Sequence, residues 1–372
     1  MIRVDENVIN LVEKLRRAIR NGNISPDIFP MGEINNLMEC TLGESFWECI
    51  GSQPNDGFQE IPGIYKKCLE KAVERKDMEE CGLLMQLFES SYIALYTALS
   101  EDEKVFREKP YRKMIIDLGT NNAQMQYRLH QERQKKIPKT AGGALGKGKG
   151  AVYTCILGDK KLMQPEEVDA QLDYICFTDN KEKWGTTEGV WQYCAIEDAG
   201  DMEERLLESR YKIMPHELLE DYDYSIWVAP DIKVTGNILR FCEIYGEGRS
   251  FLGFSSAKED CIYEDMSVTH MRMDDLNIDI RKKLVRYEKE GYPRHNGLID
   301  SRIMARDHRD KSMCEVMEAW WKEIQDCYSF MGNVFNYIAW KQNFPFSICN
   351  LFLYLNPYFK NENIDLETND DY

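Results

Sequence analysis

The sequence predicts an α/β protein in which an all-helical domain precedes a mostly parallel β-sheet with flanking helices. Two observations support this prediction. Apolar residues recur at helical spacing up to about residue 137, and beyond a glycine-rich stretch strand-like runs alternate with helical ones. At 372 residues the chain is also longer than a single hydrophobic core usually grows, so two domains are expected.

Residues 1–137 are predicted to form the helical domain. Prolines between residues 26 and 62 divide its apolar pattern into separate helices. Ser100 precedes three acidic residues, a composition that suits a new helix start because carboxylates are favourable in the first turn. Amphipathic helices of this kind usually form packing or oligomerisation modules, so a homo-oligomer through this domain is a possible arrangement.

Residues 138–150 are predicted to form a flexible linker, because they contain five glycines and three lysines. A phosphate-binding Walker loop needs a glycine five positions before its Gly-Lys pair and a serine or threonine after the lysine. Ala141 and Gly148 occupy those two places, so the linker does not match the motif.

Residues 151–357 are predicted to form the α/β domain, and residues 358–372 an acidic tail. Alternation of strands with helices is typical of a parallel sheet covered on both faces. Strands are expected over 151–157, 172–178, 190–196, 222–228, 250–254 and 297–305, and helices over 203–219, 237–245 and 274–290.

Open parallel sheets bind ligands outside the carboxyl ends of their strands. Four polar residues lie in or after the predicted strands at positions that would reach this edge. They are Thr154, Thr178, Asp179 and Asp231. An Asp-Asn pair after a strand is also ordinary turn chemistry, so Asp179 has a structural alternative.

Composition excludes several classes of function. The net charge of −17 argues against binding nucleic acid or an anionic bilayer. No run of 18 apolar residues is present, and acidic residues interrupt the first helix, so neither a transmembrane segment nor an export signal is expected. The 12 cysteines form no Cys-x-x-Cys pair, which favours reduced thiols and a cytoplasmic location.

Several blocks of the second half occur together in a specific order. They read AVYTCILGDKK, DYICFTDN, ESRYKIMPHELLEDYDYSIWVAPDIKV, DCIYEDM, EGYPRHNGLIDSRIMARDHRD and MEAWWKEI. In these blocks the chain resembles a family of hexosyltransferases found in bacteria and in plants, where members are linked to mucilage polysaccharide. The resemblance covers most of residues 151–345.

The resemblance implies a GT-A-like fold, a Rossmann-like sheet that binds a nucleotide-sugar donor. Such an enzyme must neutralise the charge that develops on the leaving diphosphate, by a divalent cation such as Mn²⁺ or Mg²⁺ or by lysine and arginine side chains. The implied metal ligand is Asp231, and Arg210 and Lys212 are the implied cationic contacts. These two lie two residues apart on a helix, so they do not share a face.

The chain departs from the family at three positions of its site. Relatives carry an Asp-Gly-Asp or Asp-Gly-Asn motif where this chain has Ala229, Pro230 and Asp231, which weakens the expectation of a metal. A His-Pro pair and an arginine are replaced by residues 255–259, in which Lys258 is the remaining cation, and an Arg-Asp-Gln segment by residues 330–332.

The general base expected from an inverting transfer has two candidates, Glu264 and Asp300. Glu264 lies beside Asp265 and has an equally plausible role in a solvated helix start. Period-2 alternation puts Asp300, Arg302, Met304 and Arg306 on one face, and Asp300 is the second base candidate if that face lines the cleft. Arg306, His308 and Trp321 are candidates for acceptor or phosphate contacts, although a lone histidine after a strand, or a tryptophan on an amphipathic helix, is more often structural.

The leading hypothesis is a glycosyltransferase that moves a hexose-like sugar from a nucleotide-diphosphate donor to a glycan or cell-surface acceptor. The alternative is a catalytically degenerate relative that binds a nucleotide sugar or glycan without turnover, which the departures from the family motifs favour. Hydrolysis of a lipid amide, associated with plant relatives, ranks last because the sequence has no histidine-rich metal cluster.

Overall fold

The computed structural model describes residues 108–135, 137, 145–158, 160–196, 202–256, 260–263, 277–325 and 334–361. The chain divides into two compact units, residues 1–122 with 368–372 and residues 123–367. Of the first unit only the start of helix α7 (Glu108–Gln134) is described, so the predicted helices before residue 108 lie outside the described residues. The domain boundaries predicted at 137, 150 and 357 stay predictions.

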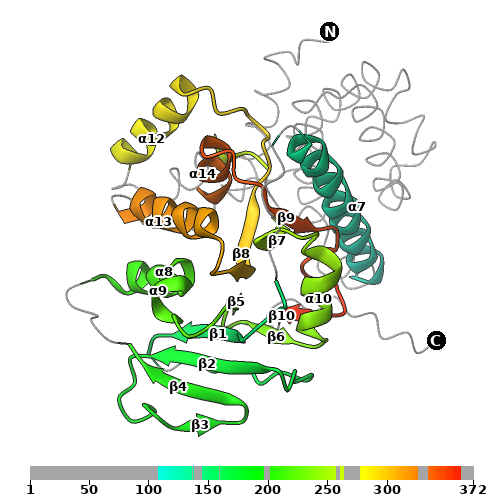
Figure 1. Cartoon of the computed structure of the whole chain (residues 1–372). Coiled ribbons are helices and arrows are strands. Elements are labelled where there is room, and N and C mark those ends of the chain that lie inside the picture. The colour runs from blue at the N-terminus through cyan, green and yellow to red at the C-terminus, as the bar shows by residue number, and fades with distance from the viewer. Residues whose placement is uncertain are drawn as a thin grey trace. The chain divides into compact units, whose positions relative to one another are not determined.

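An eight-stranded mixed sheet forms the centre of the second unit (Figure 1), with strand order β3-β4-β2-β1-β5-β8-β7-β9. Strands β4, β2, β1 and β5 pair in parallel, as do β7 and β9, whereas β3 and β8 run antiparallel to their neighbours. The strands are β1 (Gly150–Ile156), β2 (Leu172–Thr178), β3 (Thr187–Glu188), β4 (Trp191–Ala195), β5 (Tyr224–Val228), β7 (Phe251–Ser255), β8 (Ile299–Asp307) and β9 (Ser347–Cys349). The predicted α/β class with a mostly parallel sheet is confirmed.

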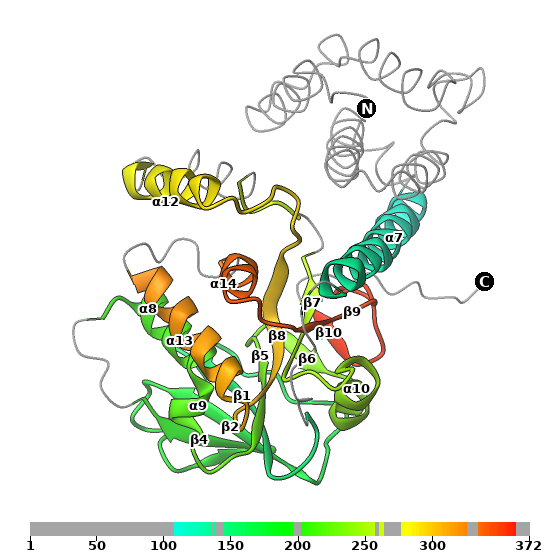
Figure 2. The same ribbon diagram turned by 45° about the horizontal axis from the view of Figure 1, so that its top comes forward.

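Both faces of the sheet are covered, which explains why the central strands are apolar along their whole length. All residues of β1 are buried, and its side chains alternate between two hydrophobic clusters. The first cluster includes residues of α8 (Glu204–Ile213), α12 (Asn277–Lys289), α13 (Lys311–Gln325) and α14 (Phe335–Lys341). The second includes residues of α10 (Ile238–Tyr245) and of a small sheet formed by β6 (Ile232–Val234) and β10 (Phe359–Asn361). Figure 2 shows α8 and α13 side by side over the first face.

The helix expected over 203–219 is divided into two. Helix α8 ends at Ile213, and α9 (Pro215–Leu218) begins with Pro215 at its first turn. Proline lacks an N–H group and suits the first turn of a helix rather than its interior, which explains the break. The helix predicted over 237–245 is present as α10, where the Asn237 side chain accepts a hydrogen bond from the Arg240 N–H at 2.7 Å and caps the N-terminus.

The alternation expected from Asp300 to Arg306 is wrong. Ile299 packs in the first hydrophobic cluster and Ile303 in the second, although strict alternation would put residues four apart on one face. The register of β7 against β8 shifts between Gly253 and Phe254, so three residues of β8 have no partner in β7. This bulge separates Asp300 from the face of Arg306.

The second unit includes residues before and after the range 151–357 that the sequence predicts for the α/β domain. On its amino side, His130 of α7 is buried and its Nε2 lies 2.8 Å from the carbonyl oxygen of Phe346. On its carboxyl side, β10 pairs with β6, and residues 359–361 belong to the second unit. None of the described helices is long and apolar enough to cross a membrane.

Candidate functional site

A cavity of about 320 Å³ lies at the carboxyl edge of the sheet, where β5 ends and the antiparallel strand β8 begins. This is the edge at which α/β sheets bind ligands. The cavity is lined by Lys160, Glu208, Lys212, Trp227, Ala229, Pro230, Asp231, Ser301 and Arg302. Two residues singled out from the sequence, Lys212 and Asp231, are therefore brought together.

The loop after β5 places Asp231 in the cavity wall. The Ala229 N–H donates to the carbonyl oxygen of Arg302 at 2.8 Å, and the Ile232 N–H donates to the carbonyl oxygen of Ala229 at 2.9 Å, which closes the turn. The carboxylate of Asp231 accepts a hydrogen bond from the Asn361 side chain at 3.3 Å. A strand distant in sequence thus helps to orient the one acid retained in the motif.

Lys212 lies in the last turn of α8 and donates from Nζ to the Ser301 hydroxyl at 3.3 Å. Burial lowers the pKa of its ammonium, and the carboxylates of Glu208 and Asp300 oppose this shift. The Lys212 carbonyl oxygen accepts a hydrogen bond from the Tyr153 hydroxyl at 3.0 Å, which ties the helix end to β1. The cavity therefore holds a partly desolvated cation on a fixed backbone.

Trp227 is a cavity residue that the sequence did not single out. It is 1% exposed, and its indole N–H has no hydrogen-bond partner within the described residues. The indole N–H can only donate, and buried donors are nearly always paired. A ligand oxygen in the cavity would supply the missing acceptor. The only signal in the sequence is its position two residues before Ala229.

Asp300 is held in an ion pair rather than left free. Both of its carboxylate oxygens accept hydrogen bonds from the Arg302 guanidinium, at 2.9 and 2.6 Å, and Arg302 also donates to the Tyr354 hydroxyl at 2.7 Å. Burial acts to lower the pKa of Arg302, but the bonds to Asp300 and Tyr354 outweigh it and raise that pKa. Both carboxylate oxygens are thus occupied by the guanidinium rather than open to an acceptor hydroxyl, which counts against Asp300 as the base.

Thr154, Thr178 and Asp179 are not among the residues that line the cavity, and the last two make hydrogen bonds at strand ends. Asp179 is exposed and accepts a hydrogen bond from the Gly158 N–H at 3.0 Å, which joins the loops after β1 and β2. The Thr178 hydroxyl accepts from the Asn180 N–H at 3.2 Å. Thr154 is buried inside β1, and its hydroxyl has no partner in the described part of the chain.

Arg306, His308, Trp321 and Arg210 are not part of the cavity lining. Arg306 is fully buried and donates to the Tyr153 hydroxyl at 2.5 Å, so a ligand in the cavity does not meet its guanidinium. Trp321 packs partly buried against the first cluster, whereas its neighbour Trp320 is fully buried. Arg210 is half-buried on α8.

His308 lies at the opposite edge of the sheet. Because β8 runs antiparallel to β5, its last residues lie beside the start of β5. His308 Nε2 is 2.8 Å from the Ser225 hydroxyl, and Nδ1 is 3.1 Å from the Tyr222 carbonyl oxygen. Burial lowers its pKa to about 4, with Arg306 acting in the same direction, so the ring is neutral at pH 7. These contacts give His308 a structural role.

Glu264, Asp265 and Lys258, and the segment 330–332, lie outside the described residues. Within the described ranges, no group of three or more histidine, cysteine, aspartate or glutamate side chains gathers closely enough to hold a metal ion. Asp231 and Glu208 are the two carboxylates of the cavity, and Glu208 lies 3.6 Å from the Lys160 ammonium. The described residues therefore do not by themselves form a divalent-cation site.

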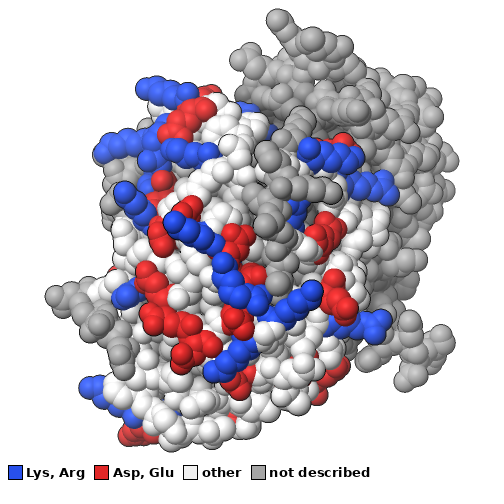
Figure 3. Space-filling model, in the orientation of Figure 1, with Lys and Arg blue, Asp and Glu red and all other residues white. Residues whose placement is uncertain are grey.

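The charged side chains on the face of the molecule seen in Figure 3 alternate in sign, without a broad area of either charge. A protein that binds along a polyanion usually has a continuous stripe of lysine and arginine side chains on its surface. Among the described residues, the face seen in Figure 3 has no such stripe.

No protein-family model matches the chain, and no curated protein sequence matches it. The solved structures that are similar to part of it include those of two enzymes. Mouse xyloside xylosyltransferase 1 in its apo form aligns with a TM-score of 0.32 and 10% identity, over 54% of this chain and 84% of the other. Core-mannan synthase A from Aspergillus fumigatus, in an Mn/GDP form, aligns with a TM-score of 0.28 and 12% identity, over 53% of this chain and 68% of the other. Similarity at this level does not bear on the function of this chain, and the resemblance to hexosyltransferases stays a prediction.

Proposed function

We propose that this chain is a glycosyltransferase that moves a hexose-like sugar from a nucleoside diphosphate donor to a glycan or other cell-surface acceptor. The observation that carries the proposal is the cavity at the carboxyl edge of the sheet. It combines the cations Lys212 and Arg302, the unpartnered donor Trp227 and the motif acid Asp231. A diphosphate is rich in acceptor oxygens and anionic, which matches these donors.

In the proposed reaction an acceptor hydroxyl oxygen forms a bond to the anomeric carbon of the donor sugar. The bond between that carbon and the diphosphate oxygen breaks, and the nucleoside diphosphate leaves with the bonding electrons. The acceptor proton passes to a carboxylate. Lys212 and Arg302 would stabilise the charge that develops on the leaving diphosphate.

Glu264 remains the better candidate for the general base, because the carboxylate of the other candidate, Asp300, is hydrogen-bonded to Arg302 through both oxygens. Asp231 would orient the donor ribose or sugar through its free acceptor capacity, while Asn361 holds its carboxylate in place. Charge neutralisation by side chains is favoured over a metal, since Ala229 replaces the first acid of the motif.

The second candidate function is donor binding without turnover. The observation that favours it is the double hydrogen bond between Arg302 and Asp300. This bond counts against Asp300, one of the two candidates for the general base. The same cavity would then serve as a nucleotide-sugar receptor.

Thermal unfolding in the presence of nucleoside diphosphates and nucleotide sugars, each with and without Mn²⁺, tests the proposal. A ligand that binds only the folded state raises the melting temperature, by an amount that grows with its concentration over Kd. We expect one nucleotide to give a selective rise that does not require Mn²⁺. Release of nucleoside diphosphate on addition of glycan acceptors then separates transfer from binding alone. If no nucleotide shifts the melting temperature of folded protein, both functions fail.

A matched pair of variants locates the site. Lys212→Met removes a cavity cation, whereas Lys311→Met removes a lysine whose side chain is 90% exposed on α13. Loss of the nucleotide-induced shift in the first variant only is the expected outcome. An equal shift in both would place the nucleotide elsewhere.

A further inference from the structure

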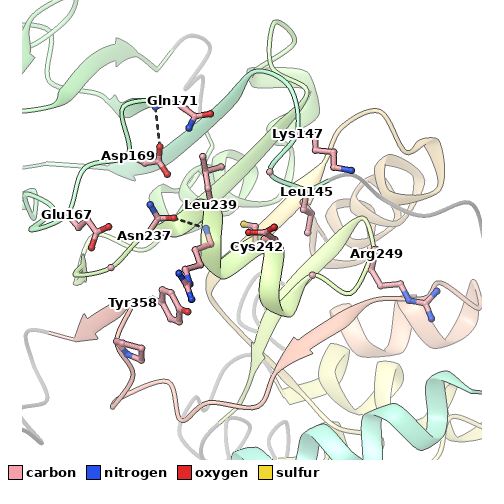
Figure 4. A pocket seen from close by; sticks show the side chains of 17 residues that line it. Leu145, Lys147, Glu167, Asp169, Gln171, Asn237, Leu239, Cys242, Arg249 and Tyr358 are labelled. Carbon is pink, nitrogen blue, oxygen red and sulfur yellow. Dashed lines mark hydrogen bonds between the residues drawn. The ribbon is translucent and has the colours of Figure 1, made fainter.

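A second and larger cavity, of about 1120 Å³, lies at the amino edge of the sheet (Figure 4). Its walls come from segments that precede β1, β2 and β7, together with α10 and the residues before β10. These strands run in one direction, because β1 and β2 are parallel and β7 is related to β5 through the antiparallel β8. We call this cavity the α10 groove; it faces away from the proposed donor site.

Asp169 is a residue of the α10 groove with an unused hydrogen-bond acceptor among the described residues. Its side chain is 8% exposed and lines the groove. One carboxylate oxygen accepts a hydrogen bond from the Gln171 N–H at 3.1 Å, and the other has no partner among the described residues. Its backbone N–H donates to the Tyr174 hydroxyl at 2.9 Å, so the residue is held in place. A ligand hydroxyl that reaches this oxygen from the groove would supply the missing donor.

The other charges of the groove exclude ligands with a strong net charge of one sign. Three basic and three acidic side chains line it: Lys147, Arg240, Arg249, Glu167, Asp169 and Glu243. In Figure 4 the labelled acids Glu167 and Asp169 lie at one end, and Lys147 and Arg249 lie at the other. A phosphate would be repelled at the acidic end, and a polyamine at the basic end.

A neutral ligand with many hydroxyl groups suits both ends. Each hydroxyl can donate to a carboxylate and accept from a lysine or arginine. Leu239 and the ring of Tyr358 add apolar surface for the C–H groups of a sugar ring. We infer that the α10 groove is a binding site for a neutral oligosaccharide, with Asp169 accepting a hydrogen bond from one of its hydroxyls. This site goes beyond the proposed donor site and does not depend on it.

Titration calorimetry of the full chain with neutral hexasaccharides of glucose, mannose and xylose tests the inference, with inorganic phosphate and spermidine as separate arms. We expect at least one hexasaccharide to bind, and the two ions not to bind. Asp169→Asn should weaken that binding by about tenfold or more, since it replaces the open acceptor with a donor. Glu220→Gln, at an exposed position outside the groove, should leave it unchanged.

The melting temperature of Asp169→Asn separates a ligand contact from a structural role. A carboxylate with an unpartnered oxygen costs stability, so the variant should melt no lower than the wild type. If it unfolds, Arg240→Met, at an exposed position of the groove wall, is the replacement test, and it should weaken the same hexasaccharide. Absence of saccharide binding, equal binding by the groove variants, or binding of phosphate or spermidine alone would overturn the inference. Nucleotide binding should persist in these variants, which keeps this test distinct from that of the proposed function.

Discussion

The burial of Lys212 leads us to expect a pH dependence of nucleotide binding. Burial lowers the pKa of its ammonium, so the side chain loses its proton at a lower pH than an exposed lysine does. If the charged form binds the diphosphate, nucleotide affinity should fall as the pH rises through this lowered pKa. Calorimetric titration between pH 6.5 and 9.5 measures the effect.

The variant Lys212→Met isolates this contribution. It should bind nucleoside diphosphate about tenfold or more weakly at neutral pH, the typical value of a charge-assisted hydrogen bond. Its affinity should also vary less with pH than that of the wild type. A pH profile identical to the wild type would remove Lys212 from the site.

At the scale of elements, the largely buried carboxylate of Glu323 links helices α12 and α13. Glu323 of α13 is 13% exposed and contacts Lys283 and Arg286 of α12, and the Tyr287 hydroxyl donates to it at 2.8 Å. Glu323→Ala should lower the free energy of unfolding by about 2 kcal/mol, because it leaves the buried Tyr287 hydroxyl and the largely buried Lys283 ammonium without this acceptor. Glu315→Ala on the same helix breaks only an exposed pair with Lys311 and should change it by less than about 0.5 kcal/mol. Chemical denaturation of both variants measures the difference, and equal losses would contradict the assignment.

The contact of α7 with the sheet is expected to depend on pH. Burial lowers the pKa of His130 to about 4, below its ordinary value, so between these two values the unfolded chain takes up a proton that the folded chain does not. Stability from this group is complete above pH 7 and is lost as the pH falls toward 4. At pH 5 the loss should be about 2 kcal/mol.

Denaturant unfolding of wild type and His130→Gln at pH 7 and pH 5 tests this expectation. Glutamine can still donate to the Phe346 carbonyl oxygen but does not titrate. The wild type should lose more stability than the variant between the two pH values. Parallel losses would assign the pH dependence to other groups.

At the scale of the whole molecule, the two cavities lie at opposite edges of one sheet and share no lining residue among those described. Two sites without shared partners should contribute independently. We therefore expect Kd for the nucleotide to be unchanged at saturating hexasaccharide, and Kd for the hexasaccharide to be unchanged at saturating nucleotide. A change of more than about threefold in either value would show coupling between the edges.

The extent of the folded unit is a second property of the whole molecule. Met125, Leu129 and His130 are buried, and they precede the boundary that the sequence suggested at residue 137. A fragment of residues 108–367 should therefore unfold at a higher denaturant concentration than one of residues 138–367. Equal midpoints would support the boundary at 137.

Much of the fold could be predicted from local sequence. The burial of β1 and β2 on both faces requires continuous apolar runs, and these are visible without knowledge of any partner. Pro215 at a helix start and Asn237 at a helix cap also act locally. The sequence analysis nevertheless predicted one continuous helix across Pro215. The position of the carboxyl edge follows from parallel pairing, which explains why Asp231 could be predicted to lie there.

The sequence by itself thus determined the main strands of the sheet and several of its helices, because these depend on periodicity over a few residues, and it predicted the edge at which we propose the ligand site. Only the tertiary structure decided that β8 runs antiparallel and bulges, which brings Ser301 and Arg302 to Lys212 and moves His308 to the far edge. It also decided that Asp300 is paired, that Trp227 finds no acceptor among the described residues, and that Asp169 lines a second groove. Strand direction, ion pairing and burial depend on partners distant in sequence, so no local pattern contains them.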